Sequence, residues 1–177
     1  NIAQQIIDLD RSRDDVRLIK AQAMVTLGRF TAARGELVML IEQPDSPHYA
    51  AALMICLDSY IAETNELIAI GGHRGVDLTA DRIAPLHVSA DETLTALAAK
   101  RGSDVVLAVF EARLLDSKAA LLQLRVDELR TRYETVQAVD AIERRDFVGA
   151  DVTTLAGQLD ALDEQLRDKC QSAIDRT

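Results

Sequence analysis

The chain has 177 residues and a formal net charge of -9, and 48% of its residues are hydrophobic although only 3% are aromatic. This length suits one domain with a hydrophobic core, and the shortage of aromatic residues, glycine and proline favours helices over sheets. The negative charge opposes nonspecific binding to nucleic acid or to anionic membrane surfaces, so we expect neither as a partner.

We expect no membrane span and no targeting segment within the sequence given. No stretch approaches the roughly 18 uninterrupted apolar residues of a membrane span, and no signal peptide heads the chain. The chain starts at Asn1 without a methionine. From this start we expect a fragment of a longer protein, whose membrane segments could lie outside the sequence given.

The first predicted element is helical and is interrupted once. Apolar residues spaced by three and four predict a long amphipathic helix over residues 1–27, with Arg13 and Lys20 on its apolar stripe. The pattern loosens at Gly28, resumes, and ends at Pro44, so we expect either a kinked helix or two helices that meet near Gly28. The stripe consists of Ile2, Ile6, Leu9, Val16, Ala23, Leu27, Phe30, Ala33, Leu37, Leu40 and Ile41.

The second predicted helix begins near Pro47. The hydroxyl of Ser46 can cap free backbone N–H groups, and proline suits the first helical turn. The glycine pair at 71–72 is predicted to end this helix. Because residues 73–88 show only weak periodicity, we predict a loop there that holds no more than one helical turn.

Three further helices are predicted after this loop. Ser89 and Glu92 form a capping-box pattern that predicts the start of the third helix, which is interrupted at residues 102–103. The longest pattern without glycine or proline runs from there to Ile142. The last helix, over residues 152–173, keeps a near-heptad apolar repeat, which is typical of bundle packing.

These elements predict an all-α fold, an antiparallel helical bundle of about five or six helices in which two stacked modules could share the long helices. We expect a single domain over residues 1–177 with its main break near residues 72–88. Cys56 and Cys170 lie in apolar helical patterns and are expected to be small buried hydrophobic residues, although a disulfide between them stays open.

Catalytic motifs are absent from the sequence. It contains no P-loop, no Gly-x-Ser-x-Gly, no His-Glu-x-x-His and no Cys-x-x-Cys. The histidines His48, His73 and His87 fall at predicted helix starts or in the predicted loop, where solvated or capping roles are commoner than metal ligation. We therefore expect no enzyme, no cofactor and no metal site.

Arginines near the core stripes are the most suggestive polar feature. Arg13 occupies a position where the stripe requires an apolar side chain, and a buried cation is costly unless an anion pairs with it. The commoner solution is a structural ion pair, for example with Asp10, Asp14 or an acid on a neighbouring helix. The alternative is that arginines of two antiparallel helices converge on a small dicarboxylate, since guanidinium groups fork carboxylates.

The second interpretation predicts a specific anion site between the first helix and the longest one. Arg13 and Arg130 would hold the carboxylates, Arg17 and Arg132 would supply charge at the rim, and Tyr133 would donate a hydrogen bond. Lys20 could join this group, or could extend its ammonium group to solvent.

The layout resembles the helical bimodular sensor domains, and the related four-helix sensor domains, of bacterial chemoreceptors and histidine kinases. The residues that carry this resemblance are Arg-Asp-Asp-Val-Arg-Leu at 13–18, Leu-Gly-Arg-Phe-Thr-Ala-Ala at 27–33, and Leu-Arg-Val-Asp-Glu-Leu-Arg-Thr-Arg-Tyr at 124–133. The resemblance implies an extracytoplasmic domain between two membrane helices, at the periplasmic face of the inner membrane. It also implies recognition of a small organic acid or other anion, homodimerisation, and chemotaxis or kinase signalling by helix displacement.

A second resemblance belongs to a different class of protein. Ala-Met-Val-Thr-Leu-Gly-Arg-Phe-Thr-Ala-Ala-Arg at 23–34, followed by Leu37, Leu40 and Pro44, looks like the junction of a tetratricopeptide repeat. That family presents peptides to a concave helical surface. One such unit is visible in the sequence, whereas stable repeat arrays normally need about three. A purely structural helical adaptor is a third possibility.

Overall fold

The computed structural model describes residues 14–74, 77–102 and 104–138, together with residues 154, 156–158, 160–165, 167–168 and 171. No strand occurs in these ranges, so the predicted all-α class is confirmed. The described residues between 154 and 171 are also helical. The five helices before them are α2 (Asp14–Thr26), α3 (Phe30–Ile41), α4 (Tyr49–Arg74), α5 (Asp77–Arg101) and α6 (Val105–Ala138).

Helices α2 and α3 form a hairpin whose turn depends on a glycine. Gly28 has a φ of 69°, a left-handed conformation that a side chain with a Cβ rarely adopts. The N–H of Gly28 donates to the carbonyl of Val25 at 3.0 Å, and the N–H of Arg29 donates to that of Met24 at 2.8 Å. Of the two predicted alternatives at Gly28, two separate helices are therefore found.

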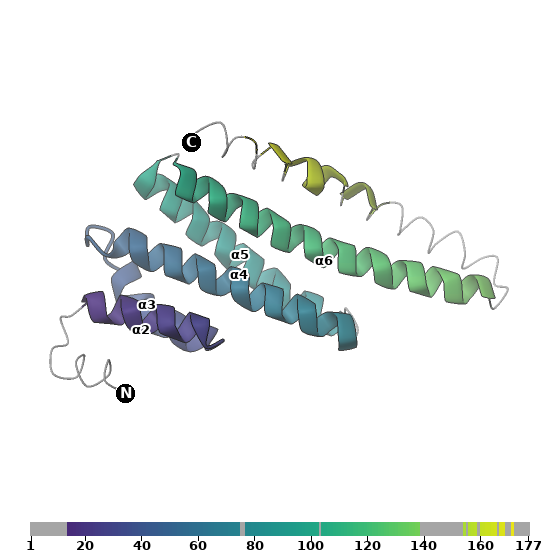
Figure 1. Ribbon diagram of the computed structural model, residues 1–177, viewed down its shortest axis with the longest axis horizontal. Helices are drawn as coiled ribbons and strands as arrows, with labels where there is room; N and C mark the ends of the chain where they lie inside the picture. The colour runs from purple at the N-terminus through teal and green to yellow at the C-terminus, as the bar shows by residue number, and fades with distance from the viewer. Residues whose placement is uncertain are drawn as a thin grey trace.

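The helices pack in a regular order along the chain (Figure 1). Helix α2 contacts α3, and α4 contacts both of them. Helix α4 also contacts α5, and α6 contacts both α4 and α5. Within the described residues α4 therefore touches every other helix from α2 to α6, whereas α2 contacts neither α5 nor α6.

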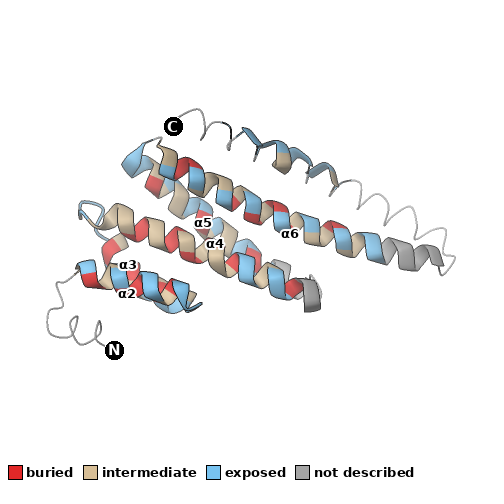
Figure 2. Cartoon of the chain, viewed as in Figure 1, coloured by how far each residue is buried: buried red, intermediate tan, exposed pale blue. Residues whose placement is uncertain are grey.

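The core is divided between two hydrophobic clusters on opposite sides of α4, and the buried residues concentrate there (Figure 2). One cluster lies between α4, α5 and α6 and contains Leu53, Leu57, Ile61, Ala90, Leu97, Leu107 and Leu114. The other lies between α2, α3 and α4 and contains Ala21, Leu37, Leu40, Ala52 and Cys56. Cys56 is thus a free, buried thiol, as its apolar stripe predicted.

The predicted loop over residues 73–88 is wrong, because α4 continues to Arg74 and α5 already begins at Asp77. Pro85 lies inside α5, where it removes one backbone donor and crowds the preceding turn. Ile83 in the same stretch is fully buried. Burial against neighbouring helices offsets the cost of the proline and the weak local pattern, a non-local effect that periodicity does not detect.

The sequence predicts helix starts near residues 47, 89 and 103, and the first and the last of these lie close to observed helix starts. Helix α4 begins at Tyr49, two residues late, and the hydroxyl of Ser46 accepts a hydrogen bond from the N–H of His48 at 3.2 Å. The predicted capping box at Ser89 is wrong, because this residue lies inside α5. Helix α6 begins after Gly102, and Asp104 caps it by accepting a bond from the N–H of Leu107 at 2.8 Å.

The buried face of α2 differs from the predicted stripe. Its buried residues are Val16, Lys20, Ala21 and Val25. Leu27, assigned to the stripe, is 70% exposed, and Ala23 is also exposed. A shift by one residue turns a helix face by about 100°, so an apolar pattern with several candidate faces is resolved only by the neighbouring helices.

No helix in the described ranges combines the length and the apolar character that crossing a membrane requires.

Candidate functional site

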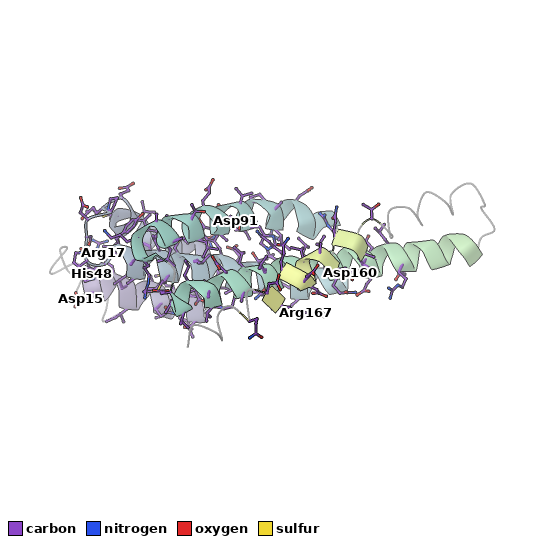
Figure 3. All side chains as sticks on the ribbon, turned by 90° about the horizontal axis from the view of Figure 1, so that it is seen from above. Asp15, Arg17, His48, Asp91, Asp160 and Arg167 are labelled. Carbon is purple, nitrogen blue, oxygen red and sulfur yellow. The ribbon has the colours of Figure 1, made fainter. Side chains whose placement is uncertain are left out.

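The residues predicted to bind an anion lie on two helices that do not contact each other. Arg17 lies in α2 with its side chain 15% exposed, and its Nε is 4.0 Å from Asp14 Oδ1. Arg130 lies in α6 and is exposed. Since α2 contacts only α3 and α4 among the described helices, Arg17 and Arg130 are not brought together. Arg17 lies near one end of the molecule (Figure 3).

The other predicted site residues are described only in part. Arg13 lies outside the described residues. Arg132 and Tyr133 lie in α6, and their side chains are outside the described part of the structure. Convergence of the whole predicted group on an anion therefore stays a prediction.

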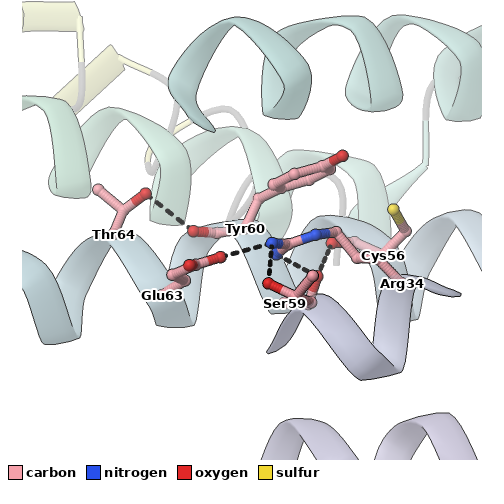
Figure 4. Close-up of polar contacts among 7 residues, drawn as sticks. Arg34, Cys56, Ser59, Tyr60, Glu63 and Thr64 are labelled. Atoms are coloured by element: carbon pink, nitrogen blue, oxygen red, sulfur yellow. Dashed lines mark hydrogen bonds and ion pairs between the residues drawn. The ribbon is translucent and has the colours of Figure 1, made fainter. Parts of the chain in front are cut away.

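Arg34 on α3 makes a set of polar contacts with α4 (Figure 4). Its Nη2 donates to Glu63 Oε2 at 2.6 Å, and its Nη1 donates to Ser59 Oγ at 3.3 Å. The guanidinium also lies over the ring of Tyr60, with Cζ 4.5 Å from the ring centroid. Such a cation–π contact adds to the ion pair, so Arg34 fastens the two helices together.

The contacts around Arg34 favour a structural role at the α3–α4 interface over a catalytic one. Ser59 is fully buried and donates to the carbonyl of Cys56 at 2.7 Å, so its hydroxyl is satisfied. Burial raises the pKa of the Cys56 thiol, and the nearby positive charge of Arg34 opposes this shift. A thiol with a raised pKa is a poor nucleophile at neutral pH. We therefore assign the cluster to the α3–α4 interface rather than to a reaction.

Sequence reasoning did not single out Arg34 or its partners. The available signal was weak: Arg34 follows Ala33 on the buried stripe of α3, and Tyr60 and Glu63 are one helical turn apart on α4. The pairing of these positions depends on how α3 crosses α4. That crossing is a tertiary property which spacing along one helix does not contain.

Lys20 forms a second part-buried ion pair, between α2 and α3. Its Nζ lies 2.7 Å from Glu36 Oε1, and its side chain is 8% exposed. Extension of its ammonium group to solvent, one of the two roles considered for Lys20, is therefore not found, and its participation in an anion site stays a prediction. The pair balances a charge that would otherwise be costly inside the hairpin.

Polar residues also meet between α5 and α6. His87 Nε2 and Ser117 Oγ are 3.4 Å apart, and Lys118 Nζ donates to both carboxylate oxygens of Asp91 at 2.8 Å. Burial, with the positive charge of Lys118 as a smaller cause, lowers the pKa of His87 from its usual 6.5 to about 4, although Asp91 acts in the opposite direction. The imidazole is therefore neutral at physiological pH.

A pocket of about 200 Å³ opens beside this polar group. Three leucines on α5 and α6 line it, and Gln165 contributes from the helical residues near the C-terminus. This segment lies along α6 in both views (Figures 1 and 3). The remaining lining residues are Asp91, Glu111 and Lys118.

Where the chain is described, no group of histidine, cysteine, aspartate and glutamate side chains is suited to hold a metal ion. The buried side-chain polar atoms of the described part all have hydrogen-bond partners. The buried polar groups of this part are therefore satisfied by other groups of the chain itself.

Comparison of the chain with protein-family models, with curated proteins and with solved structures finds no significant match in any of the three. The function is therefore argued from the arrangement of helices and side chains.

Proposed function

We propose that this chain is a protein-interaction scaffold built from stacked helix pairs, similar in principle to a tetratricopeptide array. The observation that carries the proposal is the order of the helix contacts. The pair α2–α3 is followed by α4, which touches both of its helices, and the pair α4–α5 is followed by α6, which again touches both. Stacks of helix pairs have this order, because each pair buries its apolar face against the next.

The turn between α2 and α3 supports the same proposal. It falls within the stretch whose sequence looks like a repeat junction, and Gly28 there adopts a left-handed conformation. Apolar side chains remain exposed on the outer faces of the stack, among them Val38 and Met39 on α3 and Val109 on α6. Exposed apolar residues on a helical surface are the usual material of a protein-binding face.

Two further observations favour a protein partner over a small anion. Several arginines of the described part pair with acids of this chain, as Arg34 does with Glu63 and Arg113 with Asp58. The pocket between α5 and α6, in the described part of the chain, has about 200 Å³, less than the roughly 300–1,000 Å³ of sites that enclose a small molecule. The anion-sensing alternative would place its ligand between α2 and α6, which do not meet in the described ranges.

A peptide library displayed on phage and selected on the purified 177-residue chain tests this proposal. We expect enriched sequences that bind saturably in fluorescence anisotropy. Their Kd values should be micromolar, which corresponds to a binding free energy of roughly -8 kcal/mol. Scrambled versions of the same peptides are the matched control. In parallel, we screen organic acids, amino acids and inorganic anions by thermal shift. The Tm should stay unchanged, because only a compound that binds the folded chain raises it and we expect none of these to bind.

Failure of the library to yield any saturable peptide would overturn the scaffold proposal. A reproducible rise in Tm with one class of anion would support the sensor alternative instead, and more so if the Arg13→Ala variant lost the rise. The two screens therefore separate the two function classes on one protein preparation.

A further inference from the structure

The pocket between α5 and α6 has an apolar floor and a charged rim. Leu114 is buried, and Leu94 and Leu115 are partly buried beside it. Asp91 and Gln165 are exposed at the mouth. The other rim residues, Glu111 and Lys118, are partly buried. An apolar group that entered would therefore contact leucine side chains at the floor and would have charged side chains around it at the rim.

The size of the pocket limits what can enter it. Its volume is about 200 Å³. An apolar cavity of about 150 Å³ is large enough for a benzene molecule, so this space accommodates one aliphatic side chain but no metabolite of ordinary size. A side chain that fills a pocket at an interface is the usual anchor of a protein complex.

The charges at the rim determine what should lie next to that side chain. Asp91 and Glu111 are acidic, and the ammonium group of Lys118 is already bonded to both oxygens of Asp91. The rim is therefore negative overall and opposes an anionic group. The charged residues described between 154 and 171 are also mostly acidic, with Asp160, Asp163, Glu164 and Asp168 against Arg167.

We propose that this pocket holds a leucine-like side chain of a protein partner and that a lysine or arginine next to it in the partner pairs with the acidic rim. The inference rests on the proposed scaffold function and names the chemistry of its partner. Burial of the side chain supplies affinity, and the charge at the rim selects basic sequences over acidic ones.

The test uses the whole chain with ¹³C-labelled leucine methyl groups and a defined peptide probe. The probe has one central leucine, two arginines on each side, and glycine and serine elsewhere. We expect saturable shifts in the methyl signals of Leu94, Leu114 and Leu115. Replacing the peptide leucine with alanine should weaken binding at least tenfold, and replacing its arginines with glutamates should abolish binding.

A pair of tryptophan variants tests the location. Gln165→Trp places a bulky ring at the mouth of the pocket, where the glutamine is exposed, and should weaken binding at least tenfold. Gln158→Trp is the matched control, because this exposed glutamine lies in the same segment and does not line the pocket. It should bind the probe as the unchanged chain does, and circular dichroism should show the same helix content for both variants.

Unchanged binding by Gln165→Trp, or equal binding of the glutamate peptide, would overturn this inference. If peptides from the library bind while the three leucine methyls do not move, the scaffold proposal stands and the pocket assignment fails. If no peptide of either kind binds, both fail.

Discussion

At the scale of single residues, two ion pairs of equal length differ in burial. Arg34 and Glu63 approach to 2.6 Å with side chains 16% and 21% exposed, and Arg113 and Asp58 approach to the same distance with side chains 44% and 25% exposed. Water screens the second pair more strongly. Burial, rather than distance, should therefore decide which pair stabilises the fold.

Replacing Arg34 with methionine should lower the free energy of unfolding by about 2 kcal/mol, because Glu63 loses its partner and Tyr60 loses the cation above its ring. A double-mutant cycle with Glu63→Gln, measured by urea denaturation, should give a coupling energy of about 1 kcal/mol.

The control cycle combines Arg113→Met with Asp58→Asn. Its coupling energy should be below about 0.5 kcal/mol, as for most surface pairs. Equal coupling energies for the two cycles would show that the assignment of Arg34 to the interface is mistaken.

His87 should make stability depend on pH. Its pKa is about 4 in the folded chain and 6.5 when unperturbed, so between these values the unfolded chain binds more protons. The contribution of His87 to stability is therefore fully present above pH 6.5 and is lost as the pH decreases toward 4. We expect a loss of about 1–2 kcal/mol, less than the full shift implies, because the ring is only partly buried.

Urea denaturation at several pH values between 4 and 7 measures this loss, and His87→Gln is the matched variant. Glutamine can still bond to Ser117 but does not titrate. On acidification, the free energy of unfolding of the variant should therefore decrease by about 1–2 kcal/mol less than that of the unchanged chain. Identical pH profiles for the two proteins would contradict the burial of a neutral imidazole between α5 and α6.

At the scale of helices, two glycines should respond to the same substitution in opposite directions. Gly28 has a φ of 69°, and Gly35 lies in α3 with nothing within 4 Å of the position of a Cβ. Gly28→Ala should destabilise the chain by about 1 kcal/mol, because alanine is strained in the left-handed region. Gly35→Ala should stabilise it by about 0.5–1 kcal/mol, because alanine favours the helix.

Thermal denaturation of the two variants provides this comparison, and each serves as the control for the other. A stabilised Gly28→Ala variant would mean that the two helices do not turn through the conformation described.

The stretch from 77 to 88 shows how far local patterns predict helices. The helix starts at Tyr49 and Val105 each follow a residue whose side chain accepts a backbone hydrogen bond, Ser46 and Asp104, and both starts lie close to boundaries that glycine, proline and serine signals predicted. In contrast, α5 continues through Pro85 because Ile83 is buried against other helices. Local signals locate helix ends, but burial decides whether a weak segment becomes helical at all.

At the scale of the whole molecule, the local stability of each helix should depend on how many other helices it contacts. Helix α4 contacts the other four helices from α2 to α6, whereas α2 contacts only α3 and α4 among the described elements. Helices with fewer partners open more readily. In hydrogen exchange followed by mass spectrometry, peptides from α2 should exchange at least tenfold faster than peptides from the centre of α4. Equal protection of the two helices would indicate one cooperative unit without the proposed stacking.

The sequence by itself determined that the chain is helical and that the helical pattern is interrupted near Gly28 and at Gly102. These features are local, because they depend on the propensity and backbone freedom of residues close together in the chain. The tertiary structure decided which face of α2 is buried, that Arg34 pairs with Glu63, and that α2 and α6 do not meet. Such features depend on the crossing of helices far apart in sequence, and periodicity within one helix is compatible with several crossings.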